Sequence, residues 1–279
     1  MDGQMSLFDL YEEQQLANPE NATIQIPQKA SAPAGKSLAR EKCPYKIPTI
    51  NEIMKLFDGA IYRVDRHKLL SDLFEIGAIA ISNQVDFKQV KEREERYKQI
   101  MSSYQPEEQE LLVKLWCNVY ALLNSMTYEN GEFNDWLGIL YMQNNTSNSK
   151  AGQFFTPYCV SKACAEMVIN KEGIEQKKRD GEILSVSEPA CGSGGMILAL
   201  LDVLYNKYDF NYAQNAFVEA IDIDARCAHM CYLQLSLAGV PAIVKQQDTI
   251  SRKLYNVWYT PAYCFQYLRF RKFEHCARQ

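Results

Sequence analysis

A glycine-rich stretch between two apolar runs holds the first residues whose types and spacing could do chemistry. Gly192, Gly194 and Gly195 follow Glu188 and a proline. Glycines let the backbone approach a ligand closely, and the apolar run over 196–201 opens a helix whose unpaired N–H groups would face it. The run over 182–186 is typical of a strand. A strand, a glycine-rich turn and a helix in this order predict a loop of the kind that binds nucleotides. The glycine spacing differs from the dinucleotide-binding fingerprint, and it would also suit a tight turn that binds no ligand.

Two further acids lie where neighbouring strands should end. Residues 217–222 read as a second strand ending in Asp222, and residues 242–245 as a third that leads to Asp248. Open parallel sheets bind ligands at the carboxyl ends of their strands, where the acid of the second strand holds ribose hydroxyls. Each acid alone would be an ordinary polar loop residue. Glu188, Asp222 and Asp248 at three successive strand ends favour a ligand site.

Around these residues the sequence resembles the adenine-specific DNA methyltransferases, most closely the modification subunits of type I restriction-modification systems. Four stretches carry the resemblance: Gly152-Gln153-Phe154-Phe155-Thr156-Pro157, Glu188 to Gly195, Ala220-Ile221-Asp222-Ile223-Asp224, and Gln247-Asp248-Thr249. Asp135-Trp136-Leu137-Gly138 with Tyr141 extends it upstream, so that it covers residues 135–250.

The resemblance implies a Rossmann-like domain that binds S-adenosylmethionine and methylates the exocyclic amine of adenine in DNA, in a restriction-modification or mobile-element setting. The expected cofactor-binding residues are Phe155, Thr156, Pro157, Glu188, Ala190, Gly192, Gly194, Asp222, Ile223 and Asp248. The paired aromatics Phe154 and Phe155 suit a lid over an apolar or sulfonium ligand. Thr156 as N-cap and Pro157 at the first helical position also make a good helix start by themselves.

The catalytic turn of that family, Asn/Asp/Ser-Pro-Pro-aromatic after a fourth strand, has only a partial counterpart. Thr260-Pro261-Ala262-Tyr263 keeps one proline and the aromatic residue. The resemblance assigns Thr260, Pro261 and Tyr263 as catalytic residues, with Tyr263 stacking on a flipped base. A threonine hydroxyl lacks the amide geometry. A catalytically impaired or truncated relative that binds cofactor and DNA or a partner chain therefore stays open, as does a methyltransferase acting on protein or RNA.

Two stretches of the sequence indicate binding partners, one a protein and the other DNA. Gln4, Leu7 and Phe8 resemble the peptide by which bacterial replication proteins dock on the sliding clamp, although these apolar side chains could instead fold back on the helical segment. After Asp248, cations such as Arg252 alternate with aromatic residues, which suits DNA phosphates and bases or the packing of an open sheet face. A specificity subunit, or another chain that completes the methyltransferase, is an expected partner.

The composition of the chain limits how it could contact DNA and where in the cell it is expected. With 279 residues and a net charge of −4, the chain must make any DNA contact through a local patch. The sequence shows neither a membrane-spanning apolar run nor a signal peptide, and nine cysteines indicate reduced thiols, so a cytoplasmic protein is expected. On a helix, His229 would point away from Cys227 and Cys231, so no metal site is expected.

The elements that must position these residues divide the chain into three parts. Residues 1–45 are polar and predict a flexible tail. Residues 46–148 predict a helical domain, with a capping box at Thr49 and Glu52 and a mixed-charge run over 88–98 interpreted as a solvated helix face. Residues 149–279 predict the methyltransferase-like domain. The fold-class prediction is therefore α/β, a helical N-terminal domain followed by a Rossmann-like domain that looks incomplete at its C-terminal end.

Overall fold

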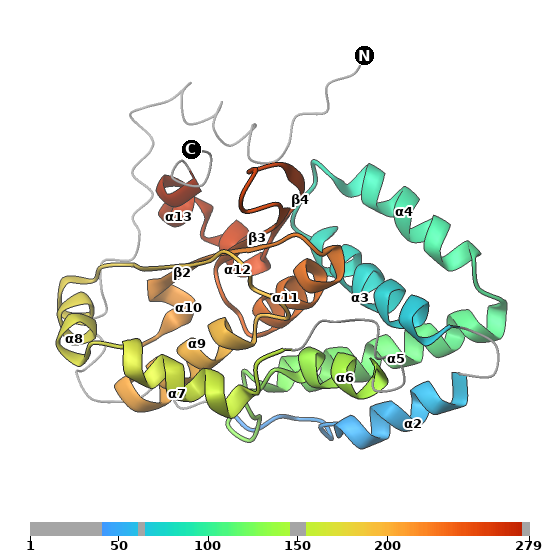
Figure 1. Cartoon of the computed structure of the whole chain (residues 1–279), viewed down its shortest axis with the longest axis horizontal. Coiled ribbons are helices and arrows are strands. Elements are labelled where there is room, and N and C mark those ends of the chain that lie inside the picture. Colours follow the sequence, from blue (N-terminus) through green and yellow to red (C-terminus); the bar gives the residue numbers. More distant parts are fainter. Residues whose placement is uncertain (1–40, 61–64, 146–154, 275–279) are drawn as a thin grey trace, which may run out of the picture.

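A four-stranded sheet with helices on both faces forms the centre of the protein (Figure 1). The computed structural model describes residues 41–60, 65–145 and 155–274. The strands are β1 (Leu184–Glu188), β2 (Ala216–Asp222), β3 (Ala242–Gln247) and β4 (Leu254–Tyr259), in the order β1-β2-β3-β4. The pairs β1–β2 and β2–β3 are parallel, and β4 runs antiparallel to β3. The predicted α/β class and the three parallel strands are confirmed.

The alternation of apolar residues along the strands gives the sheet two packed faces. Val218, Ala220 and Val244 point to one face and join the main core, whereas Phe217 and Ile243 point to the other. The main core includes residues of α9 (Gly195–Tyr208) and α11 (Ala225–Leu237). The second face packs against α12 (Pro261–Phe265) and α13 (Tyr267–Glu274), which lie on the other side of the sheet from α9 and α11 in Figure 1. The remaining helices of this part are α7 (Tyr158–Val168), α8 (Lys171–Asp180) and α10 (Tyr212–Asn215).

The N-terminal part of the described chain is helical, as predicted. Its helices are α2 (Ile50–Ala60), α3 (Arg66–Ser82), α4 (Val90–Ser102), α5 (Pro106–Ser125) and α6 (Trp136–Asn145). The capping box ahead of α2 is confirmed: the Glu52 amide donates to Thr49 Oγ1 at 3.2 Å, and the Thr49 amide donates to Glu52 Oε2 at 2.9 Å. These bonds satisfy backbone donors that the first helical turn leaves unpaired.

A single hydrophobic core joins the helical segment to the sheet. It runs from Phe57 and Leu73 through Leu233 of α11 to Val218 and Val244 of the strands. All residues from Cys227 to Leu237 are buried, because α11 lies between the sheet and the helices α3, α5 and α6. The predicted division at residues 148–149 lies outside the described residues and stays a prediction. No helix in the described part of the chain is long and apolar enough to cross a bilayer.

One residue of the mixed-charge run departs from the predicted solvated face. Arg93 of α4 is buried, and its guanidinium pairs with Asp86 at 3.0 Å and donates to the Val257 carbonyl of β4 at 2.8 Å. It also lies over the ring of Trp258, 4.0 Å from the centroid. The charge pattern could not reveal this, because the partners that bury Arg93 include a strand far away in the sequence.

Candidate functional site

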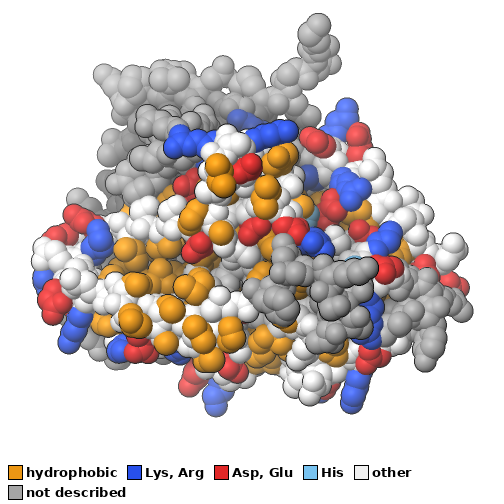
Figure 2. Space-filling view, in the orientation of Figure 1, with side chains coloured by type: hydrophobic (Ala, Val, Ile, Leu, Met, Phe, Trp, Pro, Cys, Tyr) orange, Lys and Arg blue, Asp and Glu red, His pale blue; other side chains and the backbone are white. Residues whose placement is uncertain are grey.

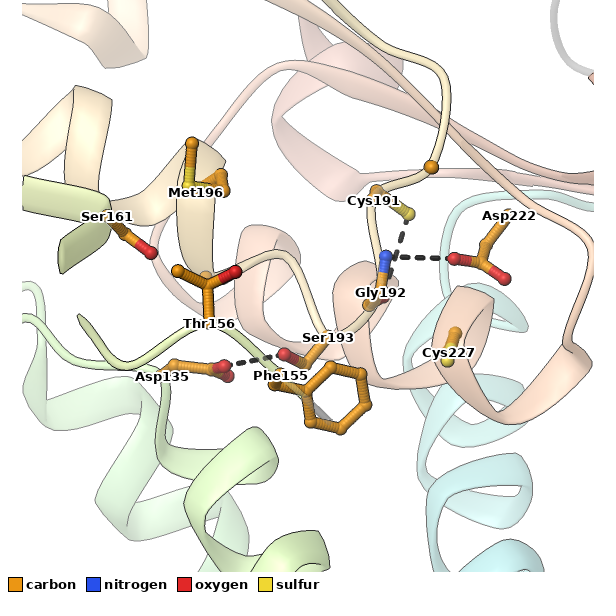
Figure 3. Close-up of a pocket in the computed structure, with 12 residues that line it drawn as sticks. Asp135, Phe155, Thr156, Ser161, Cys191, Gly192, Ser193, Met196, Asp222 and Cys227 are labelled. Atoms are coloured by element: carbon orange, nitrogen blue, oxygen red, sulfur yellow. Dashed lines mark hydrogen bonds between the residues drawn. The ribbon is translucent and has the colours of Figure 1, made fainter. Parts of the chain in front are cut away.

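A cavity of about 340 Å³ opens at the carboxyl ends of β1 and β2 (Figure 3). The glycine loop between β1 and α9, the helices α7, α9 and α11, and Asp135 just ahead of α6 contribute to its walls. Its lining residues are Asp135, Phe155, Thr156, Ser161, Ala190, Cys191, Gly192, Ser193, Gly195, Met196, Asp222 and Cys227. The position is the one predicted from the strand ends.

The glycine loop takes a conformation that favours glycine. Gly192 and Gly194 have φ values of +52° and +95°, a region that other residues rarely adopt. The loop is held by the Cys191 amide, which donates to the Ile221 carbonyl at 2.8 Å, and by the Gly194 amide, which donates to the Cys191 carbonyl at 2.8 Å. A Cβ atom on Gly192 would stand 3.1 Å from the Phe155 ring. The loop therefore brings backbone to the cavity wall at a place where a side chain would crowd Phe155.

Asp222 ties the end of β2 to this loop. Its Oδ2 accepts from the Gly192 amide at 2.9 Å, and its Oδ1 accepts from the Asp224 amide at 2.9 Å. A carboxylate offers about four lone-pair positions, so two stay available to a ligand. The next residue, Ile223, has an exposed side chain. Asp224 caps α11 and forms an ion pair with Arg226 at 2.6 Å.

A second acid reaches the loop from the opposite side, as Figure 3 shows. Asp135, just ahead of α6, is buried, and its Oδ2 accepts from Ser193 Oγ at 2.6 Å. Its Oδ1 accepts from Gln234 Nε2 at 2.8 Å and from the Gly138 amide at 3.0 Å. Burial raises the pKa of Asp135, and these hydrogen bonds oppose that rise. The predicted site did not include Asp135, Ser193 or Gln234.

The segment ahead of α7 forms another wall of the cavity. Phe155 packs on Tyr141 with ring centroids 5.6 Å apart, and both Phe155 and Thr156 line the cavity. Pro157 is the N-cap of α7, one residue later than the predicted cap, and it does not line the cavity. Gly152, Gln153 and Phe154 lie outside the described residues.

The other two predicted acids stand at the same edge of the sheet but outside the cavity lining. Glu188 Oε1 accepts from the Ala190 amide at 3.2 Å, and Glu188 borders a neighbouring apolar groove of about 190 Å³ between α7, β1 and α9. Figure 2 shows hydrophobic side chains gathered over α7 and α9 on this face. Asp248 accepts from the Ile250 and Ser251 amides and from Ser251 Oγ, and these hydrogen bonds lower its pKa.

The predicted catalytic residues lie at the other edge of the sheet from the cavity, because β4 is antiparallel to β3. Tyr259 therefore pairs with Ile243 near the start of β3, and residues 260–263 follow at the edge opposite the glycine loop, roughly 16 Å away along a six-residue strand. Thr260 Oγ1 donates to the Val240 carbonyl at 2.7 Å and accepts from the Ala242 amide at 2.9 Å. Tyr263 is 2% exposed and packs against Phe217. Thr260, Pro261 and Tyr263 close the amino edge of the sheet and do not line the cavity.

The thiols at the cavity are poor nucleophiles. The side-chain interaction of Cys191 with Cys231 and its burial raise the Cys191 pKa, and burial raises the Cys227 pKa. Thiolates, rather than thiols, react and bind metals. His229 is buried against Trp258 at 5.1 Å between ring centroids. Among the residues that the structure describes, no group of three His, Cys, Asp or Glu side chains is arranged to hold a metal ion.

A profile of a known protein family matches the part of the chain that holds the cavity. Residues 133–261 match the profile of the family described as N-6 DNA methylase. This segment holds the cavity acids and the glycine loop, as well as β1 to β4. A solved structure from Listeria monocytogenes, provisionally assigned as a class I S-adenosylmethionine-dependent methyltransferase, is 15% identical over 72% of this chain and 70% of that chain, with a TM-score of 0.33. A comparison with curated proteins gave no match.

Proposed function

We propose that this chain, whose residues 133–261 match the N-6 DNA methylases, binds S-adenosylmethionine in the cavity between Asp135 and Asp222 and serves the methylation of adenine amines in DNA. The observation that carries the proposal is the hydrogen bond from the Gly192 amide to Asp222, which joins the glycine loop to the end of β2 at the cavity wall. When bound, the cofactor would supply an activated methyl group on a sulfonium centre.

The residues of the cavity fit such a ligand. Its volume of about 340 Å³ lies within the roughly 300–1,000 Å³ of small-molecule sites. The free lone pairs of Asp222 suit ribose hydroxyls, and exposed Ile223 beside it suits the flat face of a base. At the other end, Ser161 Oγ is buried and has no hydrogen-bond partner among the described residues, so a polar ligand group would satisfy it.

Calorimetry with S-adenosylhomocysteine tests the cofactor site. Asp222→Ala removes the ribose acceptor and the bond to Gly192, and charge-assisted hydrogen bonds contribute about 1.5–3 kcal/mol, so affinity should fall at least about tenfold. Asp180→Ala, on the exposed end of α8, is the matched control and should bind as wild type does. Asp248→Ala tests whether Asp248 contacts the cofactor or only stabilises the turn after β3. Unchanged affinity would mean that Asp248 only stabilises the turn. Equal binding by wild type and Asp222→Ala would remove Asp222 from the site.

The turn between β3 and β4 supports a nucleic-acid substrate. Thr249 Oγ1 donates to the Pro189 carbonyl of the glycine loop at 2.6 Å, so this turn lies beside the loop. It presents exposed Arg252 and Lys253, and Lys253 lies 5.0 Å from the ring centroid of half-exposed Tyr255. Cations neutralise phosphates, and exposed rings stack on bases.

Anisotropy with a labelled adenine-containing oligonucleotide tests this contact. The double variant Arg252→Ala/Lys253→Ala should bind more weakly, and the slope of log K against log salt should fall by about one to two. A double variant of two exposed lysines on α8, Lys171→Ala/Lys178→Ala, has the same loss of charge and should keep the wild-type slope. Equal slopes for wild type and the turn variant would exclude the turn as a DNA contact.

A second candidate function is cofactor and DNA binding without methyl transfer. The position of Thr260 and Tyr263 at the opposite edge of the sheet favours it, because neither can hold an adenine at the cavity. Tritium transfer from labelled S-adenosylmethionine to DNA decides between the two functions, with the chain alone and with a specificity subunit. Transfer that survives Tyr263→Leu, which removes the aromatic ring, would support the enzyme with its acceptor site elsewhere. The absence of transfer in both conditions would support the second candidate.

Sliding-clamp binding through Gln4, Leu7 and Phe8 is a separate proposal, and these residues lie outside the described part of the chain. Docking of an extended peptide needs the apolar anchor, so Phe8→Ala should abolish retention of the chain on immobilised clamp. Retention of Phe8→Ala equal to that of wild type would end this proposal.

A further inference from the structure

Three segments that are distant in the sequence meet at one buried carboxylate in the wall of the cavity. Asp135 precedes α6, Ser193 belongs to the glycine loop, and Gln234 lies on α11. Gln234 Nε2 donates both to Asp135 Oδ1 and to the Ser193 carbonyl, at 2.8 Å each, and Gln234 Oε1 accepts from the Leu137 amide at 3.2 Å. Together with the Ser193 hydroxyl bond to Asp135 Oδ2 at 2.6 Å, these bonds hold both the side chain and the backbone of Ser193.

From this geometry we infer that Asp135 is a positioning residue that sets the conformation of the glycine loop for ligand binding. Asp135 acts through Ser193, one residue from the Gly192 amide that Asp222 holds. The loop is thus anchored on both sides, by Asp222 from the sheet and by Asp135 from the helical segment. This inference rests on the proposed cofactor site, and it extends that site to a residue to which neither the resemblance nor the motif assigned a role.

The packing around Asp135 leaves little room for another arrangement. A Cβ atom on Gly138 would stand 2.1 Å from Asp135 Oδ2, and one on Gly195 would stand 2.8 Å from the same oxygen. Two backbone segments, at the starts of α6 and α9, therefore approach the carboxylate closely. A group confined in this way fixes the geometry of the loop, because the loop cannot shift without breaking charge-assisted hydrogen bonds inside the protein.

Two readouts test the inference, and one of them needs no ligand. In Asp135→Asn, the amide oxygen stays with the two donors at the Oδ1 position, and the N–H₂ group that faces Ser193 Oγ can only donate to it. The charge-assisted bond from Ser193 is thereby replaced by a weaker neutral one. We expect amide hydrogen exchange of peptides covering residues 189–198 to become at least about tenfold faster in the ligand-free protein. We also expect the affinity for S-adenosylhomocysteine to fall at least about tenfold. Ser193→Ala removes the other partner of the same bond, so the double variant should bind no more weakly than the weaker single variant.

Asp72→Asn is the matched control. Asp72 of α3 is also buried, and its Oδ2 accepts from the Tyr104 hydroxyl and from Lys68 Nζ at 2.7 Å each. Its replacement should lower the melting temperature without changing exchange at residues 189–198 or affinity. The inference is overturned if Asp135→Asn leaves the exchange of that peptide at the wild-type rate, or if Asp72→Asn accelerates it equally. If wild type fails to bind S-adenosylhomocysteine, the proposed function fails, while the exchange result still decides the role of Asp135.

Discussion

Replacing Arg93 by methionine should destabilise the fold far more than an ordinary substitution on a charged helix. The change keeps much of the side-chain length, but it removes the ion pair with Asp86 and the hydrogen bond to the Val257 carbonyl. It also removes the guanidinium from above the Trp258 ring. Asp86 would stay buried at 8% exposure, with Gln89 Nε2 as its remaining side-chain donor at 2.8 Å.

The expected loss of stability is large because the ion pair between Arg93 and Asp86 is buried. Breaking a buried ion pair by removing one partner costs about 3–5 kcal/mol, because the other charge stays uncompensated. In a protein of this size, each 1 kcal/mol lowers the melting temperature by about 2–4 °C, so we expect a fall of about 6–20 °C. Urea unfolding followed by circular dichroism measures the free-energy difference directly.

Arg96→Met provides the control on the same helix. Arg96 makes a two-pronged pair with Glu75, at 2.6 and 2.8 Å, but its side chain is half exposed. Exposed pairs contribute about 0–1 kcal/mol. The two-pronged geometry and the 18% exposure of the Glu75 side chain place this pair at the upper end of that range, so the control should lose about 1 kcal/mol. The double variant Arg93→Met/Asp86→Leu should recover part of the loss, because no uncompensated charge is left. Equal losses for Arg93→Met and Arg96→Met would refute the claim that burial decides the effect.

Two further predictions concern pH and the glycine loop. Burial lowers the pKa of His229 to about 4, below its ordinary value of 6.5, so the unfolded chain binds a proton between these values and the folded chain does not. The free energy of unfolding should therefore fall by about 2 kcal/mol from pH 7 to pH 5. Urea unfolding of His229→Gln should lack this part of the fall. An identical pH dependence of the two proteins would contradict the lowered pKa of His229. Gly194→Ala should lower the free energy of unfolding by more than the roughly 1–2 kcal/mol that a left-handed backbone conformation costs a residue with a side chain, because its Cβ would stand 3.1 Å from Cys231 Sγ. It should also weaken the binding of S-adenosylhomocysteine. Gly239→Ala has a similar φ of +71° and open space around its Cβ, so thermal melts that show equal losses would exclude the contact as the cause.

Features that depend on neighbouring residues were predictable from the sequence. The glycine loop, the strand before it and the helix after it are encoded within residues 182–208, and turn chemistry and periodicity suffice to recognise them. Asp222 was predictable for a related reason, since the end of a second parallel strand lies beside the end of the first. The capping box of Thr49 and Glu52 needs only three residues of spacing.

Features that depend on distant partners were not predictable in this way. Asp135 joins Ser193 and Gln234, which lie 58 and 99 residues away, and no periodicity connects such positions. The unexpected position of Thr260 and Tyr263, at the edge of the sheet opposite the cavity, has a topological cause. Their position after a fourth strand was correct, but whether that strand runs parallel or antiparallel decides at which edge of the sheet they lie, and the pattern of apolar residues does not determine its direction.

Because α11 is buried from Cys227 to Leu237 between the sheet and the helices α3, α5 and α6, we do not expect the two segments of the chain to be separable into stable fragments. A fragment beginning at residue 155 would expose to water the apolar side of α11 that now contacts α3, and such a surface promotes aggregation. The helical segment should thus be kept in any shortened protein prepared for binding or crystallisation. Conversely, one ligand bound at the cavity should raise the melting temperature of both segments together, as a single cooperative transition.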